Sequence, residues 1–117
     1  GLKTILTAVE KVKSGISICI FPEGTRNKEP DECNLLPFHE GSFKIATKAN
    51  CPIIPIALNN TAQIFEAHMP KVTPCHVVVE YGKPIYPDQL EKEDKKHLGA
   101  YTQKIIAEML NKNKELL

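Results

Sequence analysis

The sequence predicts an α/β fold in which a central mixed or mostly parallel sheet is flanked by helices. Three observations predict it: amphipathic helical patterns at both ends of the chain, short β-branched apolar runs between them, and Gly, Pro or Asn residues at the boundaries. We expect a single domain over residues 1–117, because 42% hydrophobic content in 117 residues supports one modest core. The formal net charge of +1 gives no general field for nucleic acid, so no nucleic-acid partner is expected.

Residues 1–21 predict a helix followed by a buried strand. One helix face collects the apolar residues, which are Leu2, Ile5, Leu6, Val9 and Val12. Ser14 and Gly15 predict the end of this helix, and the β-branched run Ile16–Phe21 suits a strand buried in a sheet. A helix that leads directly into a buried strand is typical of α/β folds.

The central part of the chain predicts an exposed loop over residues 27–37, then a helix and a strand. In the stretch FHEGSFKIATKAN, a helix that begins near Gly41 places its apolar residues on one side, with Asn50 as its end cap. The stretch CPIIPIAL is apolar but interrupted by Pro52 and Pro55, so we expect a short strand at Ile53–Ala57.

The last part of the chain predicts a third strand and a long helix. The β-rich run Cys75–Tyr81 ends at a glycine, which indicates a strand. Asp88 is the expected N-cap of the final helix, whose acidic first turn and basic last turn complement the helix dipole. Its predicted buried stripe consists of Leu98, Tyr101, Ile105 and Met109.

The cysteines are widely spaced and include no Cys-x-x-Cys pair; they are Cys19, Cys33, Cys51 and Cys75. This pattern predicts buried free thiols in a reducing compartment, with disulfides or a metal site as the alternatives. Three histidines have no carboxylate, Ser or Cys at a spacing that defines a catalytic pair, so we expect no catalytic role for His68, His76 and His97.

No apolar run approaches the roughly 18 to 20 residues that a membrane-spanning helix needs, and no signal peptide precedes the domain. The chain starts at Gly1 without a methionine and enters helical sequence at once, so we expect it to be a piece of a longer protein. Lys3, Lys11 and Lys13 lie opposite the apolar stripe of the first helix, which therefore either packs on the core or lies on a bilayer surface.

The stretch FPEGTR, residues 21–26, combines groups that suit an anion site at the end of a strand. Pro22 fixes the backbone as it leaves the sheet, and Gly24 permits a sharp turn. Arg26 offers a planar fork of donors for a phosphate or carboxylate, and Thr25 adds a hydroxyl. Glu23 would repel an anion, so it is expected to orient Arg26 or to accept from a substrate hydroxyl. The alternative is a surface turn with a local Glu–Arg pair.

Three blocks in order, namely FPEGTR, FHEGSFKIA and CPIIPIAL, resemble the glycerolipid acyltransferase family that includes 1-acylglycerol-3-phosphate acyltransferase. The resemblance implies that Glu23, Gly24, Thr25 and Arg26 bind the phosphate of a lysophosphatidate-like acceptor. It also implies transfer of a fatty acyl group from an acyl-CoA or acyl carrier protein thioester, with no cofactor and no metal. Phospholipid biosynthesis of this kind implies a location at the membrane surface, on the cytoplasmic side.

The sequence departs from this family in one central respect. Family members carry a His and an Asp separated by four residues, upstream of the Glu-Gly-Thr-Arg motif, and this chain has no such pair. We therefore interpret the chain as the C-terminal part of an acyltransferase domain that supplies no catalytic residue and is inactive alone. The alternative is a non-catalytic module that binds phosphate or a lipid headgroup. His39 stands where relatives often have Lys or Arg, and either faces the phosphate or is a solvated loop residue.

Overall fold

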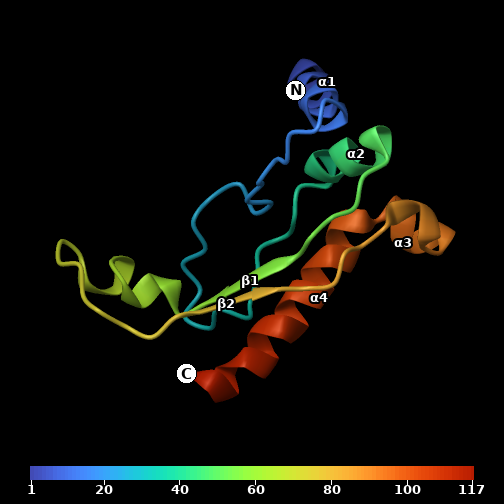
Figure 1. The fold of residues 1–117 in the computed structure, drawn as a ribbon. Coiled ribbons are helices and arrows are strands. Elements are labelled where there is room, and N and C mark those ends of the chain that lie inside the picture. Colours follow the sequence, from blue (N-terminus) through green and yellow to red (C-terminus); the bar gives the residue numbers. More distant parts are fainter.

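The computed structural model describes all 117 residues and has a mixed architecture of helices and a small sheet (Figure 1). The helices are α1 (Leu2–Lys13), α2 (Glu40–Ala49), α3 (Lys92–Lys96) and α4 (Leu98–Asn113). The strands β1 (Ile56–Asn59) and β2 (Val78–Tyr81) pair antiparallel, with Ile56 opposite Tyr81. Single turns of 3-10 helix lie at Thr61–Gln63, Glu66–His68, Pro87–Gln89 and Lys114–Leu116. The expected α/β class is confirmed, but the sheet is one antiparallel pair of strands and not the mixed or mostly parallel sheet that the sequence predicted.

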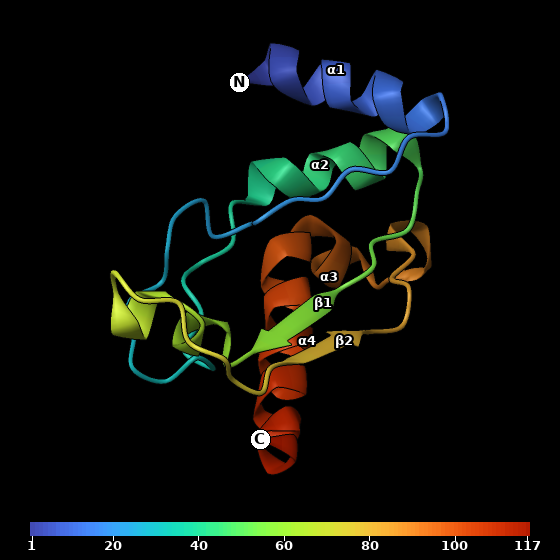
Figure 2. The same cartoon turned by 60° about the vertical axis from the view of Figure 1, so that its left-hand side comes forward.

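In Figure 2, α1 forms one layer, α2 forms the next, and the two strands with α4 form the third. The helix α1 lies along α2 at one end of the molecule, and both strands cross the long helix α4 at the other. The radius of gyration is 15.5 Å, compared with about 13.4 Å for a typical compact domain of this length. The chain is therefore more extended than an ordinary domain of its size.

The two helices expected in the first half of the chain are confirmed. The helix α1 ends in its basic last turn, and Val9 from its apolar stripe is buried against the rest of the protein. The helix α2 begins one residue before Gly41 and ends at Asn50, whose φ of 52° places it in the left-handed conformation of a helix end cap. Local sequence signals were sufficient for both.

The strand expected at Ile16–Phe21 is absent, and this prediction was wrong. The segment runs as exposed chain, and its middle residues form no backbone hydrogen bonds with a neighbouring strand. Ile16 is 51% exposed and Phe21 is 77% exposed. The physical reason is that a strand needs a partner for its N–H and C=O groups, and none lies beside this segment.

The other two strands form in part. The strand β1 starts at Ile56 instead of Ile53, because Pro55 has no N–H to donate to the ladder. Ile53 instead forms an isolated bridge, in which Ile53 and Ile85 exchange backbone hydrogen bonds of 2.8 and 2.7 Å. The strand β2 covers only the second half of the expected Cys75–Tyr81.

The final helix begins nine residues later than predicted, and its N-cap is His97 and not Asp88. Asp88 lies in a separate 3-10 turn, and α4 starts at Leu98. The carboxylate of Glu40 in α2 caps α4, because Oε1 accepts from Gly99 N at 2.7 Å and Oε2 accepts from Ala100 N at 3.1 Å. The helix therefore starts where a residue distant in sequence satisfies its free N–H groups.

The core consists of two small clusters, one near the start of α4 and one near its end. The first contains Phe38, Phe43, Ile85 and Leu98, and the two phenylalanine rings stack with centroids 6.1 Å apart. The second contains Ala57, Met109 and Leu110. The cysteines are free thiols, but their predicted burial was wrong, since Cys19 and Cys75 are exposed and the other two are half-buried. No helix has the length and the apolar character that crossing a membrane requires.

Candidate functional site

The FPEGTR stretch forms a tight turn directly before the loop that leads to α2. Gly24 N donates to Phe21 O at 3.1 Å, and Gly24 has a φ of +73°, which L side chains rarely adopt. A Cβ on Gly24 would lie 2.8 Å from Nε2 of His39, so the imidazole ring packs directly on the glycine. His39 N also donates to Pro22 O at 2.9 Å. The turn therefore needs glycine both for its backbone conformation and for the contact with His39.

Glu23 anchors the turn and forms no ion pair with Arg26. Its Oε2 accepts from Leu36 N at 2.8 Å and from Asn27 Nδ2 at 3.0 Å. Asn27 Nδ2 also donates to Asn34 O at 2.7 Å. The carboxylate is thus bound to the following loop and does not orient Arg26, and the alternative role, accepting from a substrate hydroxyl, stays a prediction. Its hydrogen-bond partners offset part of the repulsion that a bare carboxylate would exert on an anion.

The side chains of Thr25 and Arg26 lie on the solvent side of the turn. Both residues are exposed, and neither side chain forms a hydrogen bond or an ion pair within the chain. An unpaired guanidinium beside backbone N–H groups of a glycine turn suits an incoming phosphate or carboxylate. The assignment of Glu23, Gly24, Thr25 and Arg26 to acceptor binding stays a prediction.

The helix α4 holds the loop that carries this turn. Gln103 Nε2 donates to Leu36 O at 2.8 Å and to Leu35 O at 3.3 Å, and Phe38 is buried in the first core cluster. The sequence analysis missed Gln103, because nothing local connects it to a loop 67 residues away. The turn is therefore a product of two regions distant in sequence.

The middle of the loop is fixed by two further acidic side chains. Glu32 accepts from Asn59 Nδ2 at 2.7 Å and from Asn60 N at 2.6 Å. The N–H of Cys33 donates to Asp31 at 2.9 Å and, together with Lys114 at 3.3 Å, lowers the pKa of the Asp31 carboxyl. The carboxylates of Asp31 and Glu32 therefore tie the middle of the loop to Lys114 and to the end of β1.

The histidines are dispersed. His39 is exposed at the N-cap position of α2 and lies against the FPEGTR turn. His97 lies 3.9 Å from Glu93, and both side chains are exposed. No group of three or more His, Cys, Asp or Glu residues is arranged to hold a metal ion.

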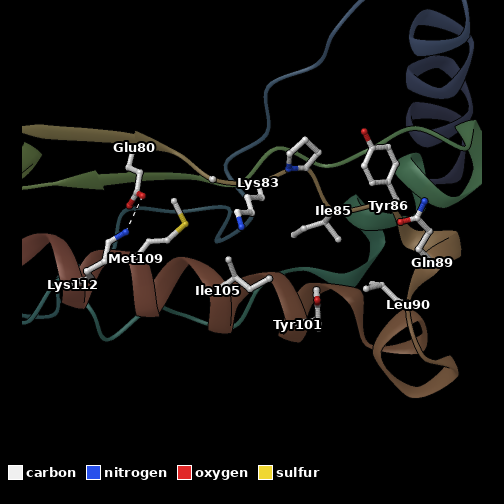
Figure 3. A pocket seen from close by; sticks show the side chains of 12 residues that line it. Glu80, Lys83, Ile85, Tyr86, Gln89, Leu90, Tyr101, Ile105, Met109 and Lys112 are labelled. Atoms are coloured by element: carbon white, nitrogen blue, oxygen red, sulfur yellow. Dashed lines mark hydrogen bonds and ion pairs between the residues drawn. The ribbon is translucent and has the colours of Figure 1, made fainter.

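A surface hollow of about 520 Å³ lies between β2 and α4, on a different part of the molecule (Figure 3). Its apolar wall includes Ile85, Ile105 and Met109, and an ion pair of 3.0 Å between Glu80 and Lys112 lies at one end. None of the FPEGTR residues lines it. The hollow is therefore not the predicted phosphate site.

Comparison with known proteins identifies the family. Residues 2–59, which include the FPEGTR turn and α2, match the family profile described as Acyltransferase. A 1-acyl-sn-glycerol-3-phosphate acyltransferase of Cocos nucifera is 38% identical over 97 residues, which are 83% of this chain and 30% of that protein. The corresponding enzyme of Escherichia coli is 34% identical over 98 residues, which are 84% of this chain and 38% of that protein.

The fold agrees with a solved structure from the same group. The crystal structure of the 1-acyl-sn-glycerophosphate (LPA) acyltransferase PlsC from Thermotoga maritima superimposes with a TM-score of 0.80 and 25% identity. The match covers 96% of this chain and 46% of that one, so the chain spans less than half the length of its relatives. On the sequence blocks, the fold and these matches together, the chain belongs to the acyltransferase family that includes the 1-acyl-sn-glycerol-3-phosphate acyltransferases.

Proposed function

We propose that this chain is the acceptor-binding part of a 1-acylglycerol-3-phosphate acyltransferase, in which the FPEGTR turn binds the phosphate of a lysophosphatidate-like acceptor. The observation that carries the proposal is the state of Arg26, which is exposed and unpaired on a turn that Glu23 and Gly24 hold in place. A guanidinium with no internal partner keeps its full hydrogen-bonding capacity for a phosphate dianion. The names of the relatives support lysophosphatidate as the acceptor.

The reaction that follows is acyl transfer from a thioester. The acceptor hydroxyl attacks the acyl carbon of acyl-CoA or acyl-acyl carrier protein, the C–S bond breaks, and the released thiolate takes up the proton that the hydroxyl loses. A neutral hydroxyl needs a general base, and the 117 residues contain no His and Asp at the family spacing. We infer that these 117 residues are inactive alone and that the base lies elsewhere in the full-length protein. The enzyme would act at the membrane surface, on the cytoplasmic side.

The second candidate function is a non-catalytic module that holds a phosphate ester or lipid headgroup. The same exposed Arg26 supports it, because binding needs no base. Isothermal calorimetry of the 117-residue chain with glycerol 3-phosphate, together with an acyl-transfer assay of the full-length protein, separates the two. Binding with turnover supports the enzyme, and binding without turnover in the full-length protein supports the module.

The test of phosphate recognition is Arg26→Ala in the full-length protein, assayed with lysophosphatidate and with monoacylglycerol, which lacks the phosphate. We expect KM for lysophosphatidate to rise roughly 10- to 100-fold, the value of a charged hydrogen-bonded contact, with little change for monoacylglycerol. Lys28→Ala, which removes the same charge two residues further along, is the control. An unchanged KM for lysophosphatidate in Arg26→Ala would remove the assignment of Arg26 to the phosphate.

A further inference from the structure

We propose that Gln103 is a positioning residue for the acceptor phosphate, acting through the loop that anchors the FPEGTR turn. This inference rests on the proposed function of the turn and adds to it a residue of the C-terminal helix. The connection has two steps, from Gln103 to the loop residues Leu35 and Leu36, and from Leu36 to Glu23.

The first step joins α4 to the loop. Gln103 Nε2 carries two hydrogens, and carbonyl oxygens of the loop lie 2.8 Å away at Leu36 and 3.3 Å away at Leu35. The neighbouring side chains in α4 do not do this: the buried hydroxyl of Thr102 donates to Leu98 O within the helix, and Lys104 is exposed. Gln103 is thus the side chain through which α4 hydrogen-bonds to this loop.

The second step joins the loop to the motif. The carbonyl of Leu35 and the N–H of Leu36 belong to one planar peptide group, so a donor on the carbonyl fixes the direction of the N–H. That N–H donates to Glu23 Oε2 at 2.8 Å. A hydrogen bond to the carbonyl also polarises the peptide group and strengthens the bond that its N–H makes. The helix therefore positions Leu36, through the 3.3 Å bond to the Leu35 carbonyl and the 2.8 Å bond to the Leu36 carbonyl, and with it the N–H that holds Glu23.

The consequence concerns Arg26, three residues further along the turn. With Glu23 fixed by Leu36, and Pro22 fixed by His39 N at 2.9 Å, the backbone of the turn is held on both sides of its tip. A turn held in this way presents Arg26 with less conformational freedom to lose on binding. Without the donor of Gln103, one of these two anchors is weakened, and affinity for a phosphate ester falls.

The variant Gln103→Met keeps the length of the side chain and removes the donor, and Lys104→Met makes the same replacement at the adjacent exposed position. In the 117-residue chain we expect Leu36 N–H of Gln103→Met to exchange with solvent at least roughly tenfold faster than in Lys104→Met. We expect its Kd for glycerol 3-phosphate, by calorimetry below the unfolding midpoint, to rise roughly three- to tenfold, the value of one hydrogen bond. A residue that only stabilises the fold would lower the unfolding midpoint and leave this Kd unchanged.

An unchanged Kd or an unchanged exchange rate of Leu36 in folded Gln103→Met would overturn the inference. If Gln103→Met does not fold, Gln103→Asn keeps the amide but withdraws it by one methylene, and it must weaken the same Kd. Arg26→Ala is measured in parallel, because loss of binding there with no change in Gln103→Met contradicts only the role of Gln103. If the unmodified chain binds no glycerol 3-phosphate, the proposed function fails and the inference about Gln103 fails with it.

Discussion

The helix α2, which follows the FPEGTR turn and its loop, differs sharply from the segment Ile16–Phe21, which precedes the turn. Both regions carry apolar residues, and both were expected to be ordered elements of one sheet-and-helix core. The helix α2 (Glu40–Ala49) buries Phe43 and Ala46, and Phe38, just before it, is 8% exposed. The segment Ile16–Phe21 forms no strand, and Phe21 is 77% exposed. A helix satisfies its own backbone, whereas a strand depends on a neighbour that must be present.

The largest expected effect is a difference in the free energy of unfolding between two variants, one that truncates a core side chain and one that truncates a side chain of the segment Ile16–Phe21. Leu98 is 2% exposed in the core cluster with Phe38 and Phe43, so Leu98→Ala should lower the free energy of unfolding by about 2–5 kcal/mol. Ile18 is 39% exposed and belongs to neither core cluster, so its replacement by alanine should cost less, about 1 kcal/mol, because more than a third of its surface stays in water. Urea denaturation of the 117-residue chain measures both.

The variant Ile18→Ala in a longer chain tests why the segment Ile16–Phe21 forms no strand here. If the segment is a strand without a partner, Ile18→Ala should become more destabilising in the full-length protein, where a neighbouring strand can cover it. Equal costs for Ile18→Ala in the two chains would contradict this explanation. Amide exchange of residues 17–20, which form no backbone ladder here, should slow in the same comparison.

The parts of the fold that were predicted correctly are those with local causes. The apolar stripe of α1, the start of α2 near Gly41 and the end cap at Asn50 all follow from residues within one or two turns. The start of α4 could not be predicted, because the carboxylate that caps it belongs to Glu40, 59 residues before Gly99. Asp88 was a plausible local cap, but Glu40 accepts from the first N–H groups of α4 instead.

The candidate site divides in the same way. The glycine turn and an exposed Arg26 were readable from FPEGTR alone, and the link to phosphate came from the resemblance of three sequence blocks. The true partner of Glu23 was not readable, since Leu36 lies 13 residues away in an irregular loop. No sequence pattern indicated Gln103, which lies 67 residues from Leu36. Sequence indicated which groups carry the chemistry, and tertiary contacts determine what holds them.

A smaller effect is expected from adding one methyl group to the turn. Gly24→Ala must adopt a φ of +73° and push against the ring of His39, so we expect a loss of about 1–3 kcal/mol in the free energy of unfolding. Binding of glycerol 3-phosphate should weaken as well, because the turn must shift. Thermal or urea unfolding and calorimetry measure the two effects.

Gly41→Ala is the matched control for Gly24→Ala, since a Cβ there meets nothing within 4 Å. Gly41 lies inside α2, where alanine is the better helix former, so the same replacement should be neutral or stabilising by up to about 1 kcal/mol. If both variants lost the same stability, the strain assigned to Gly24 would be wrong.

The smallest expected effect is the pH dependence of the contact between β2 and α4. Unlike the segment 16–21, which has no strand partner, β2 is held by side-chain contacts to α4. Glu80 in β2 accepts from Lys112 Nζ and from Asn113 Nδ2, each at 3.0 Å, and these bonds, that from Lys112 foremost, lower the pKa of the Glu80 carboxyl below its usual 4.5. A carboxyl with a lowered pKa in the folded state stabilises the fold above pH 4.5, and this contribution is lost as the pH falls through the lowered value.

The Glu80→Gln variant removes this contribution at neutral pH and has little left to lose in acid. We therefore expect the unfolding midpoint of the unmodified chain to exceed that of Glu80→Gln near pH 7, and the gap to close by about pH 3. Glu108→Gln is the control, because Glu108 lies exposed on α4, the helix that carries Lys112, and its side chain forms no hydrogen bond or ion pair. A gap that stays constant from neutral to acidic pH would show that Glu80 holds β2 through packing alone, and that its charge contributes nothing to the attachment.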